Sequence, residues 1–459
     1  MTASPPAPTR SRRLPALGHL VPRGAILLSV LTFGSYLIGL LRDRILTRTF
    51  GAGADLDTFN AAFVIPELLF GVLVASGLAA PFIPIFAGLR RDRGEPAAHA
   101  FGQTVLTLAV LTMGVVAVIL FVAAPLTVDI VAPGFDAPQR DRYVELFRVM
   151  CVTQVLFAGS MALGEVLIAE RRFFFYGAAP LLYNLGLVVG TILFADTIGI
   201  FAPAIGAVLG ATMHAGLRLV GIRWRTSFRP RPRLDVRTSE LREFFRLMLP
   251  KTATGPLEPI TFLFFTSVAS GLVAGSITTV NLARNFQSVP VSLIGVAFAL
   301  ATFPALAAAY AAHDRRAFTR LVVTNTATIG LLTIAAAAGL VVVGPLAIDV
   351  LLGGGRFDAD DVARTASVLA IFALSVPFES LGHLLSRAIY ATHHTLLQVG
   401  ASLVGFVVTI VTTAATLDAI GVLAIPVGFT AGSATRLVLL IAVLVPRIRR
   451  IGRAVSPRP

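Results

Sequence analysis

The charged side chains inside the first two apolar runs of the chain include Arg42, Asp43, Asp57 and Glu67. An ionised side chain at membrane depth costs about 2.5–3.5 kcal/mol on insertion scales, so such residues usually face protein or a water-filled cavity. Adjacent side chains point apart on a helix, so we expect Arg42 to pair with Asp57 or another residue rather than with Asp43. Asp57 begins the second run, where an acid also suits a helix N-terminus. We predict that all four line a cavity, with structural pairing or capping as the alternative.

A fifth charge, Arg284, lies in the segment NLARNFQSVP between Asn281 and Asn285. No acid adjoins it along the chain, and a guanidinium suits an anionic ligand such as a pyrophosphate. We therefore predict that these three residues bind substrate together with the four charges of the first two runs. The predicted substrate-binding residues are Arg42, Asp43, Asp57, Glu67, Asn281, Arg284 and Asn285.

A second group of titratable residues lies in later apolar runs. Glu165 and His383 occupy matching positions of an internal repeat described below, and Glu379 and Arg387 lie one turn to either side of His383. The latter three can pair along one helix face. We predict a structural network for these four residues, with proton coupling as the alternative role.

The sequence lacks the residue patterns typical of nucleotide hydrolysis, nucleophilic catalysis and metal binding. The sequence holds no phosphate-binding P-loop, no nucleophile elbow and no His, Cys or carboxylate spacing typical of a metal site. We therefore expect no enzyme activity, no cofactor and no metal. Cys151 is the single cysteine and lies in an apolar run, so an intramolecular disulfide is excluded.

The composition indicates that these charged residues lie on helices of a membrane protein. Of 459 residues, 56% are hydrophobic and only 14% are charged, against about 25% in soluble proteins. The net charge of +14 would fit a nucleic-acid partner, but the arginines lie between apolar segments and not on one polar domain. We expect the lipid bilayer as the partner, and no nucleic acid.

Twelve apolar runs have the length that a spanning helix needs, about 20 residues. Connections such as 90–93, 223–246 and 447–453 are rich in arginine, whereas the alternate connections, such as 51–55, are nearly free of Lys and Arg. Basic connections stay in the cytoplasm, so both termini are expected there. The second and eighth runs are long and contain prolines, which predicts tilted or kinked helices. The runs lie near 26–48, 57–88, 101–124, 146–169, 174–195, 198–221, 248–271, 277–310, 322–344, 364–389, 396–416 and 420–445.

The chain also repeats itself. Residues 63–92 resemble 286–316, and APLTVDIVAPGFDA (124–137) resembles GPLAIDVLLGGGRFDA (344–359). A repeat of six helices gives two lobes of the same orientation, with a substrate site between them near the midplane of the membrane. The predicted fold is therefore an all-α polytopic membrane protein with about 12 transmembrane helices in two parallel six-helix lobes around a central cavity. The predicted domains are a basic cytoplasmic tail (1–25), an N-terminal lobe (26–222), a basic cytoplasmic linker (223–247), a C-terminal lobe (248–446) and a cytoplasmic tail (447–459).

Several segments resemble one known family. GLLRDRILTRTFGAGADLDTFNAAFVIPELL (39–69), followed by AAPFIPIFA, is similar to the amino-terminal signature of the MurJ/MviN lipid II flippases. RRFFFYGAAPLLYNLGLVVG (171–190), LARNFQSVPVSLIGVAFALATFPALA (282–307) and GPLAIDVLLGGGRFDADD (344–361) resemble later parts of the same family, which belongs to the exporter superfamily for multidrug and oligosaccharidyl-lipid substrates. The resemblance covers nearly the whole chain after residue 25 and implies a flippase.

The resemblance also implies site residues and shows departures. Arg42, Asp43, Asp57 and Arg284 match charged cavity residues of the family. Some relatives bind a cation through carboxylates in helices seven and eleven; here the first position is Phe265, and the eleventh run has no carboxylate. Family members often have fourteen helices. Further positions where typical members carry a charge are occupied here by Tyr36, Phe70, Gly71, Ala75 and Ala283.

Three functions follow as hypotheses. The first is a flippase in the plasma membrane of a bacterium that moves a polyprenyl-pyrophosphate-linked saccharide, above all the peptidoglycan precursor lipid II, with cell-wall synthesis proteins as further partners. The second keeps the fold and changes the cargo to another lipid-linked oligosaccharide or to drugs. The third is a membrane scaffold that has lost transport together with the missing cavity charges.

Overall fold

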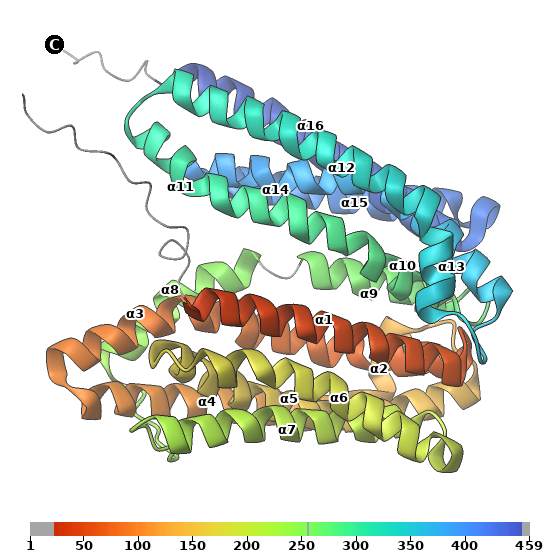
Figure 1. Cartoon of the computed structure of the whole chain (residues 1–459), viewed down its shortest axis with the longest axis horizontal. Helices are drawn as coiled ribbons and strands as arrows, with labels where there is room; N and C mark the ends of the chain where they lie inside the picture. The colour runs from red at the N-terminus through yellow and green to blue at the C-terminus, as the bar shows by residue number, and fades with distance from the viewer. Residues whose placement is uncertain (1–22, 255–256, 452–459) are drawn as a thin grey trace, which may run out of the picture.

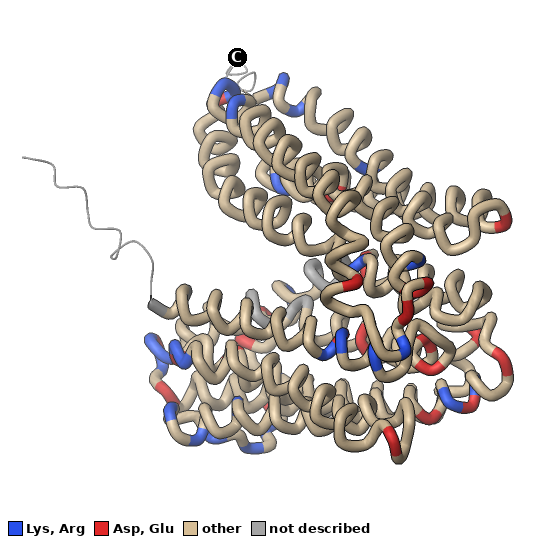
Figure 2. The backbone as a smooth tube through the Cα atoms, turned by 45° about the vertical axis from the view of Figure 1, so that its right-hand side comes forward, with Lys and Arg blue, Asp and Glu red and all other residues tan. Residues whose placement is uncertain are grey.

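The computed structural model describes residues 23–254 and 257–451, and within them the fold is built from helices without a β-sheet. Two groups of helices, here called the first and the second lobe, meet at one end and diverge at the other (Figures 1 and 2). The first lobe contains α1 (Arg23–Phe50), α2 (Ala54–Phe70), α3 (Ser76–Arg93), α4 (Glu95–Val131), α5 (Ala137–Ala169), α6 (Phe173–Ile198) and α7 (Phe201–Arg225). The second lobe contains α9 (Leu257–Ser270), α10 (Ser276–Pro290), α11 (Ala297–Ala311), α12 (Arg315–Leu352), α13 (Ala359–Ala373), α14 (Val376–Ala391), α15 (Thr395–Ile420) and α16 (Ala424–Arg450).

The helices of the two lobes correspond in length and order. α6 and α15 have 26 residues each, and α4 and α12 have 37 and 38. The uninterrupted helix α5 corresponds to α13 and α14 together, which cover Ala359–Ala391 but bend by 41° at their junction. The repeat seen in the sequence is therefore also present in the element lengths, while the predicted domain boundaries stay a prediction.

Membrane spans are fewer by strict criteria than the twelve predicted. In the described residues, nine helices are long and apolar enough to cross a membrane, or ten if α13 and α14 form one span. This number takes Thr395–Arg450 as one run, although a 3-10 turn at Gly421–Leu423 separates α15 from α16, and it leaves out α9, which has 14 residues. The helical membrane fold is confirmed, and the exact number of twelve is not.

The second and eighth apolar runs, which were predicted to be tilted or kinked, both depart from regular α-helical geometry. A π-helical turn at Gly71–Ala75, here η2, separates α2 from α3, and another at Val291–Val296, here η3, separates α10 from α11. Prolines lack the backbone N–H that an α-helix needs in its interior, and π turns recur at functional sites. Pro290 directly precedes the second π turn.

The predicted basic linker packs against the first lobe. It contains the end of α7, an irregular segment (226–238) and the start of α8 (Ser239–Thr254). The ring of Phe244 on α8 lies 5.9 Å from that of Phe101 on α4, and Arg93 donates to Glu240 at 2.5 Å. Residues 1–22 and 452–459 of the two predicted tails lie outside the described residues.

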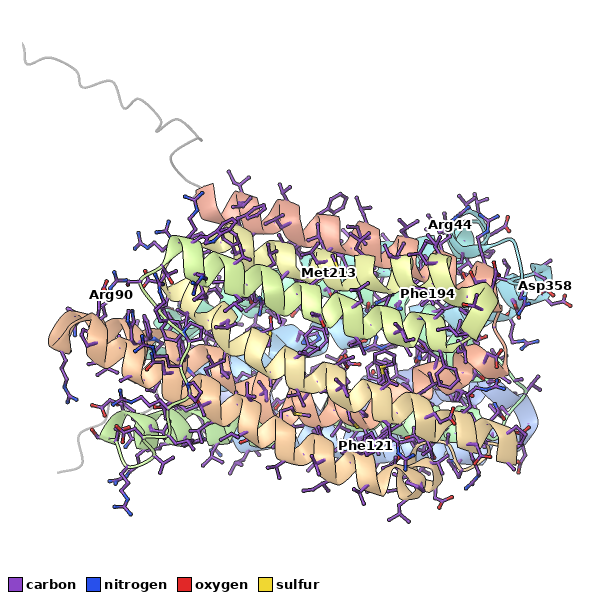
Figure 3. All side chains as sticks on the ribbon, turned by 90° about the horizontal axis from the view of Figure 1, so that it is seen from below. Arg44, Arg90, Phe121, Phe194, Met213 and Asp358 are labelled. Atoms are coloured by element: carbon purple, nitrogen blue, oxygen red, sulfur yellow. The ribbon has the colours of Figure 1, made fainter. Side chains whose placement is uncertain are left out.

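The two ends of the molecule differ in charge. One end, here the basic end, carries Arg90–Arg93 and the arginines that close α16, and there the lobes diverge (Figure 2). The opposite end, here the acidic end, carries many acids, including Asp358 (Figures 2 and 3). Phe121 and Phe194 lie on the outer face of the first lobe, as large exposed apolar residues do on a lipid-facing surface (Figure 3). The long axis of the helices therefore runs along the expected membrane normal.

Candidate functional site

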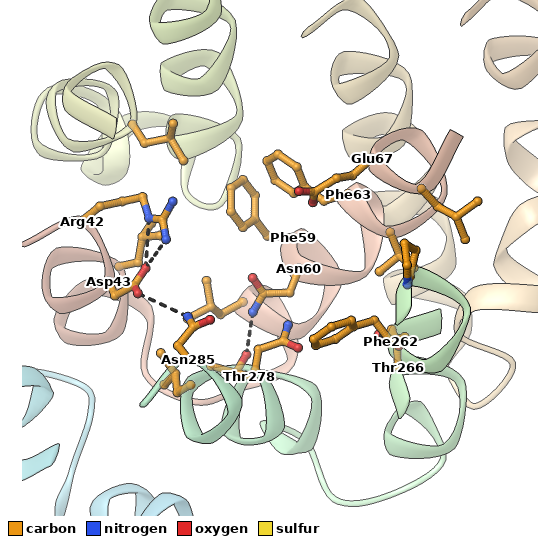
Figure 4. A pocket seen from close by; sticks show the side chains of 18 of the residues that line it. Arg42, Asp43, Phe59, Asn60, Phe63, Glu67, Phe262, Thr266, Thr278 and Asn285 are labelled. Atoms are coloured by element: carbon orange, nitrogen blue, oxygen red, sulfur yellow. Dashed lines mark hydrogen bonds and ion pairs between the residues drawn. The ribbon is translucent and has the colours of Figure 1, made fainter. Parts of the chain in front are cut away.

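A cavity of about 820 Å³ lies between the two lobes (Figure 4). α1, α2 and α6 form one wall, and α9 and α10 form the other. Polar side chains stand among apolar ones on both walls, which suits a ligand with both characters. The polar and charged lining residues are Arg42, Asp43, Thr47, Asn60, Glu67, Tyr183, Glu258, Thr266, Thr278, Asn281 and Asn285.

Arg42 and Asp43 form an ion pair, which contradicts the expectation that neighbours on a helix cannot face each other. The Nε and Nη2 atoms of Arg42 donate to Oδ1 of Asp43 at 2.9 and 2.6 Å. The long, flexible arginine side chain curls back along the helix and so reaches a residue whose Cβ points elsewhere. Its third donor, Nη1, binds Oδ1 of Asn184 on α6 at 2.9 Å. Asp57 is not the partner of Arg42.

Two amide contacts join the lobes across the cavity. Asn285 on α10 donates to the second carboxylate oxygen of Asp43 at 3.5 Å, and Asn60 on α2 donates to the hydroxyl of Thr278 at 3.1 Å (Figure 4). Asn281, also predicted to bind substrate, lies on the same wall as Asn285. The amides can both donate and accept, so this wall can bind hydroxyl and amide groups of a ligand.

Glu67 lies on α2 and lines the cavity, and its carboxylate has no hydrogen bond or ion pair among the described residues. The guanidinium of Arg42 interacts with it electrostatically but is bound to Asp43 and Asn184. Glu258, on the opposite wall, is 72% exposed. The cavity thus combines one paired arginine with two accessible carboxylates.

Asp57 lies where the lobes meet, and it caps a helix of the opposite lobe and not its own. Its carboxylate accepts hydrogen bonds from the backbone N–H groups of Gly275 at 2.8 Å and Thr278 at 2.7 Å, and from the Thr278 hydroxyl at 2.7 Å. The side chain is 3% exposed. These donors form the N-terminus of α10, where a negative charge is favoured. Asp57 therefore fastens α2 to α10 at the acidic end.

Further contacts close the same end. Nη1 of Arg44 donates to the carbonyl of Leu351 at 2.9 Å, and the N–H of Ala52 donates to Asp361 at 3.1 Å. The N–H of Arg356 donates to the carbonyl of Arg48 at 2.9 Å. Each pair joins the first lobe to the second, so the structure is closed at the acidic end and diverges at the basic end (Figure 1).

Arg284 is not the lone cation that the sequence indicated. It is 6% exposed, and its Nη1 and Nη2 atoms donate to the two oxygens of Glu379 at 3.0 and 2.8 Å. Its guanidinium also lies over the rings of Phe429 and Phe262, at 4.8 and 5.8 Å. The side chain is thus held inside the second lobe rather than on the wall of the central cavity. Its predicted role in substrate binding stays a prediction.

The predicted network around His383 has a different composition. Glu379 pairs with Arg284 on α10 and accepts from Gln287 at 2.9 Å, so its ion-pair partner is not Arg387 on its own helix. The Gln287 amide also donates to Ser375, at the bend between α13 and α14. Buried ion pairs of this kind require full hydrogen bonding to be tolerated. The network therefore links α10 to the bent helix pair.

Glu165 lies in the first lobe, 1% exposed, with one carboxylate oxygen unpaired among the described residues. It interacts electrostatically with Arg218 on α7, which donates to the carbonyl of Ser160 at 2.9 Å. The Ser160 hydroxyl lies 2.7 Å from Nδ1 of His214. Glu165 and His383 thus stand in separate lobes, each within its own polar cluster.

Several functional candidates were missed from the sequence. Asn184, Asn60 and Thr278 join Arg42 and Asp57 in the cavity network, and Arg218 and His214 form the polar interior of the first lobe. Their signal was available, because polar residues in apolar runs are rare and face the interior of a helix bundle. This sequence signal was weak for the uncharged residues, since the free energy of placing a threonine or asparagine in lipid is far lower than that of placing a charged side chain there.

The helical lobes with a polar cavity between them define a polytopic membrane transporter. Solved structures with the same fold include "Lipid II flippase MurJ, inward closed conformation", with a TM-score of 0.77, 19% identity and coverage of 93% of this chain and 90% of that one. An inward-facing MATE family multidrug resistance transporter of the MOP superfamily gives a TM-score of 0.78 at 13% identity, with coverage of 95% and 100%.

The sequence relatives narrow this class. The family model described as "Lipid II flippase MurJ" matches residues 46–455. The chain is 28% identical over 403 residues to a "Probable lipid II flippase MurJ" of Bdellovibrio bacteriovorus, covering 84% of this chain and 75% of the relative. It is 27% identical over 361 residues to one of Thermotoga maritima, covering 79% and 72%. The chain belongs to the MurJ family of lipid II flippases, and it is a multi-pass bacterial membrane protein.

Proposed function

We propose that this protein moves lipid II from the cytoplasmic to the outer leaflet of the bacterial plasma membrane. The observation that carries the proposal is the polar cavity between the lobes, closed at the acidic end, in a chain whose family model covers residues 46–455. A charged headgroup loses its hydration when it crosses lipid, and a polar cavity replaces the lost contacts. The proposal makes the chain a transporter and not an enzyme.

The two walls supply complementary groups for such a headgroup. Arg42 is a bidentate donor suited to a pyrophosphate, which would compete with Asp43 for the guanidinium. Asn281 and Asn285 would bind sugar hydroxyls and amides from the opposite wall. The lipid tail stays in the bilayer, because hydrocarbon gains nothing from a polar cavity. In this proposal Glu67 lies beside the headgroup, whereas Asp57 fastens the lobes at the closed end and does not line the cavity.

The lobes would rock about this site. The basic end faces the cytoplasm by the positive-inside rule, which places both termini there and makes the described state open to the cytoplasmic side. The predicted lobes 26–222 and 248–446 then move as two bodies, with the linker 223–247 attached to the first. Release on the far side requires that the contacts of Asp57, Arg44 and Asp361 break.

We propose that the energy source of transport acts on the buried polar clusters around Glu165 in the first lobe and Glu379 in the second. Glu165 in the first lobe, and Glu379, His383 and Arg387 in the second, remain candidates for proton coupling or for structural roles. Cell-wall synthesis proteins remain proposed partners. No cofactor is required by this mechanism.

Two experiments test the proposal. Purified protein in proteoliposomes should expose fluorescent lipid II to an external enzyme, and the gene should support growth of a bacterium depleted of its own lipid II flippase. Arg42→Ala should lower the translocation rate at least about tenfold, which corresponds to about 1.4 kcal/mol. Arg148→Ala is the matched control, because Arg148 on α5 lies over the ring of Phe121 on α4, at the outer face of the first lobe.

Correctly inserted protein that neither translocates lipid II nor complements would refute the proposal. A scaffold would give this negative result, and its behaviour in its own host would stay wild-type when Arg42 and Arg284 are both replaced by alanine. Translocation of a different lipid-linked oligosaccharide, with lipid II ignored, would change the cargo and keep the mechanism.

A further inference from the structure

A second cavity, of about 580 Å³, lies inside the first lobe. α1 and α2 form its sides, and α5, α6 and α7 form its floor. It shares Phe63, Glu67 and Tyr183 with the central cavity, so Glu67 stands at the boundary of the two. Its volume is that of a pocket for a small organic molecule, about 300–1,000 Å³.

Aromatic side chains dominate the walls of this pocket. Phe157 on its floor contacts Phe70, Tyr183 and His214, with ring centroids 6.0, 4.8 and 5.1 Å away. Tyr36, Phe63 and Tyr176 complete the aromatic lining. Aromatic faces attract cations through the ring quadrupole.

The charges of the pocket favour a cation as well. Glu67 and Arg218 are the charged residues of the described lining. The Arg218 guanidinium is already engaged: it donates to the carbonyl of Ser160, lies 4.8 Å from the centroid of the Tyr176 ring and interacts with Glu165. The carboxylate of Glu67 has no hydrogen bond or ion pair among the described residues. Arg42, which interacts with Glu67 from outside this lining, is neutralised by its ion pair with Asp43. With that pair set aside, the carboxylates Glu67 and Glu165 outweigh Arg218 by one charge.

A glycine fixes Arg218 in this arrangement. Gly164 on α5 faces the guanidinium, and a Cβ at that position would lie 2.9 Å from Cζ of Arg218. The absence of a side chain at Gly164 therefore leaves the room against α5 that the guanidinium occupies. Glu67 is left as the charge that a ligand can still neutralise.

We propose that this pocket binds an organic cation, with Glu67 as its counter-ion and the aromatic lining around its apolar part. The shared chemistry is a positive nitrogen or phosphorus centre that carries hydrocarbon groups. It could be supplied by an ammonium group on the headgroup of the transported lipid, a source that rests on the proposed function, or by a separate amphipathic cation. A pocket of this size and with one free carboxylate does not match a bare metal ion, which needs several ligands.

The test uses the full chain in lipid nanodiscs, with tetraphenylphosphonium as the probe and empty nanodiscs as the background. Tetraphenylborate has the same shape and the opposite charge, so it is the matched control ligand. We expect saturable binding of the cation and none of the anion. Glu67→Gln should weaken cation binding at least about tenfold, whereas Glu145→Gln, which neutralises an exposed carboxylate on α5, should leave it unchanged.

A second variant protects the test against misfolding. Tyr36 is 67% exposed, so Tyr36→Ala should fold normally and still weaken cation binding several-fold through loss of one aromatic face. Equal binding of both ions, or unchanged cation affinity in folded Glu67→Gln and Tyr36→Ala, would overturn the proposal.

A competition arm separates the two sources. Lysine-containing lipid II is added to protein loaded with tetraphenylphosphonium, in parallel with lipid II whose lysine amine is acetylated. Displacement that acetylation abolishes assigns the headgroup as the source, and any other pattern assigns a separate cation. Cation binding in a protein that fails to translocate lipid II would refute the proposed function alone.

Discussion

Asp57 offers the sharpest test of how the lobes are held together. Its carboxylate accepts three hydrogen bonds from Gly275 and Thr278, all across the lobe interface. Asp57→Asn keeps the size and leaves one oxygen for Thr278, but it places an amide N–H against the N–H of Gly275. A hydrogen bond to a charged group contributes about 1.5–3 kcal/mol, so the closed state should lose about that much.

This free energy predicts an increase of about 10–150-fold in the ratio of open to closed protein at the acidic end. A rare open state is best detected by a rate. Ile277 is 1% exposed beside Asp57, so Ile277→Cys in a Cys151→Ser background reacts with a membrane-impermeant maleimide only while that end is open. When opening is fast and reversible, the labelling rate follows the open population.

The labelling rate should therefore rise about 10–150-fold on Asp57→Asn. Asp136→Asn is the control, because Asp136 caps its own helix α5 through Gln139 and does not bridge the lobes. A change of less than about twofold in the folded Asp57→Asn protein would refute the view that this carboxylate fastens the lobes.

Three further outcomes follow from the packing and the ion pairs. Glu379→Ala should destabilise the protein by about 3–5 kcal/mol in thermal unfolding, because it leaves the buried Arg284 with only the exposed Glu258, at 3.9 Å, as a counter-charge, and adding Arg284→Met should recover much of the loss. Gly206→Leu should abolish the folded peak in size-exclusion chromatography, since even a Cβ there would lie 2.7 Å from the carbonyl oxygen of Gly186 on α6. Gly330→Leu is the control and should keep the peak, because no packing neighbour lies within 4 Å of a Cβ at that position. Arg42→Lys should slow lipid II translocation nearly as much as alanine, because an ammonium cannot reach both the carboxylate and the amide that the guanidinium now joins; full activity would contradict this.

The sequence alone predicted much of the fold because lipid imposes simple rules. Apolar run lengths and alternating arginine-rich connections were enough for a helical membrane protein, and the repeat predicted paired lobes. Charges and amides in apolar runs pointed to the cavity wall, where Arg42, Asp43, Glu67, Asn281 and Asn285 do lie. Their role in binding stays a prediction.

Pairing in space was beyond the sequence. Arg284 is 95 residues from Glu379 along the chain, and no helical periodicity relates α10 to α14. The prediction that Arg42 and Asp43 would not pair was wrong for another reason. The rule for neighbours on a helix describes the directions of their Cβ atoms, and the long arginine side chain can curl back to reach the next residue. The bend between α13 and α14 likewise depends on tertiary contacts that hydropathy does not record, such as the hydrogen bond from Gln287 to Ser375.

The π turns at Gly71–Ala75 and Val291–Val296 have a mechanical consequence. Each holds one residue more than an α-helical turn would, between a helix that closes the acidic end and a helix that continues to the basic end. One residue corresponds to about 100° of helix rotation. If the surplus residue moves along the helix, α3 or α11 turns about its own axis and presents a different row of side chains, while α2 and α10 stay fastened. Each lobe thus contains a π turn at the equivalent place of the repeat, about which one half of a long helix can rotate while the helix stays continuous.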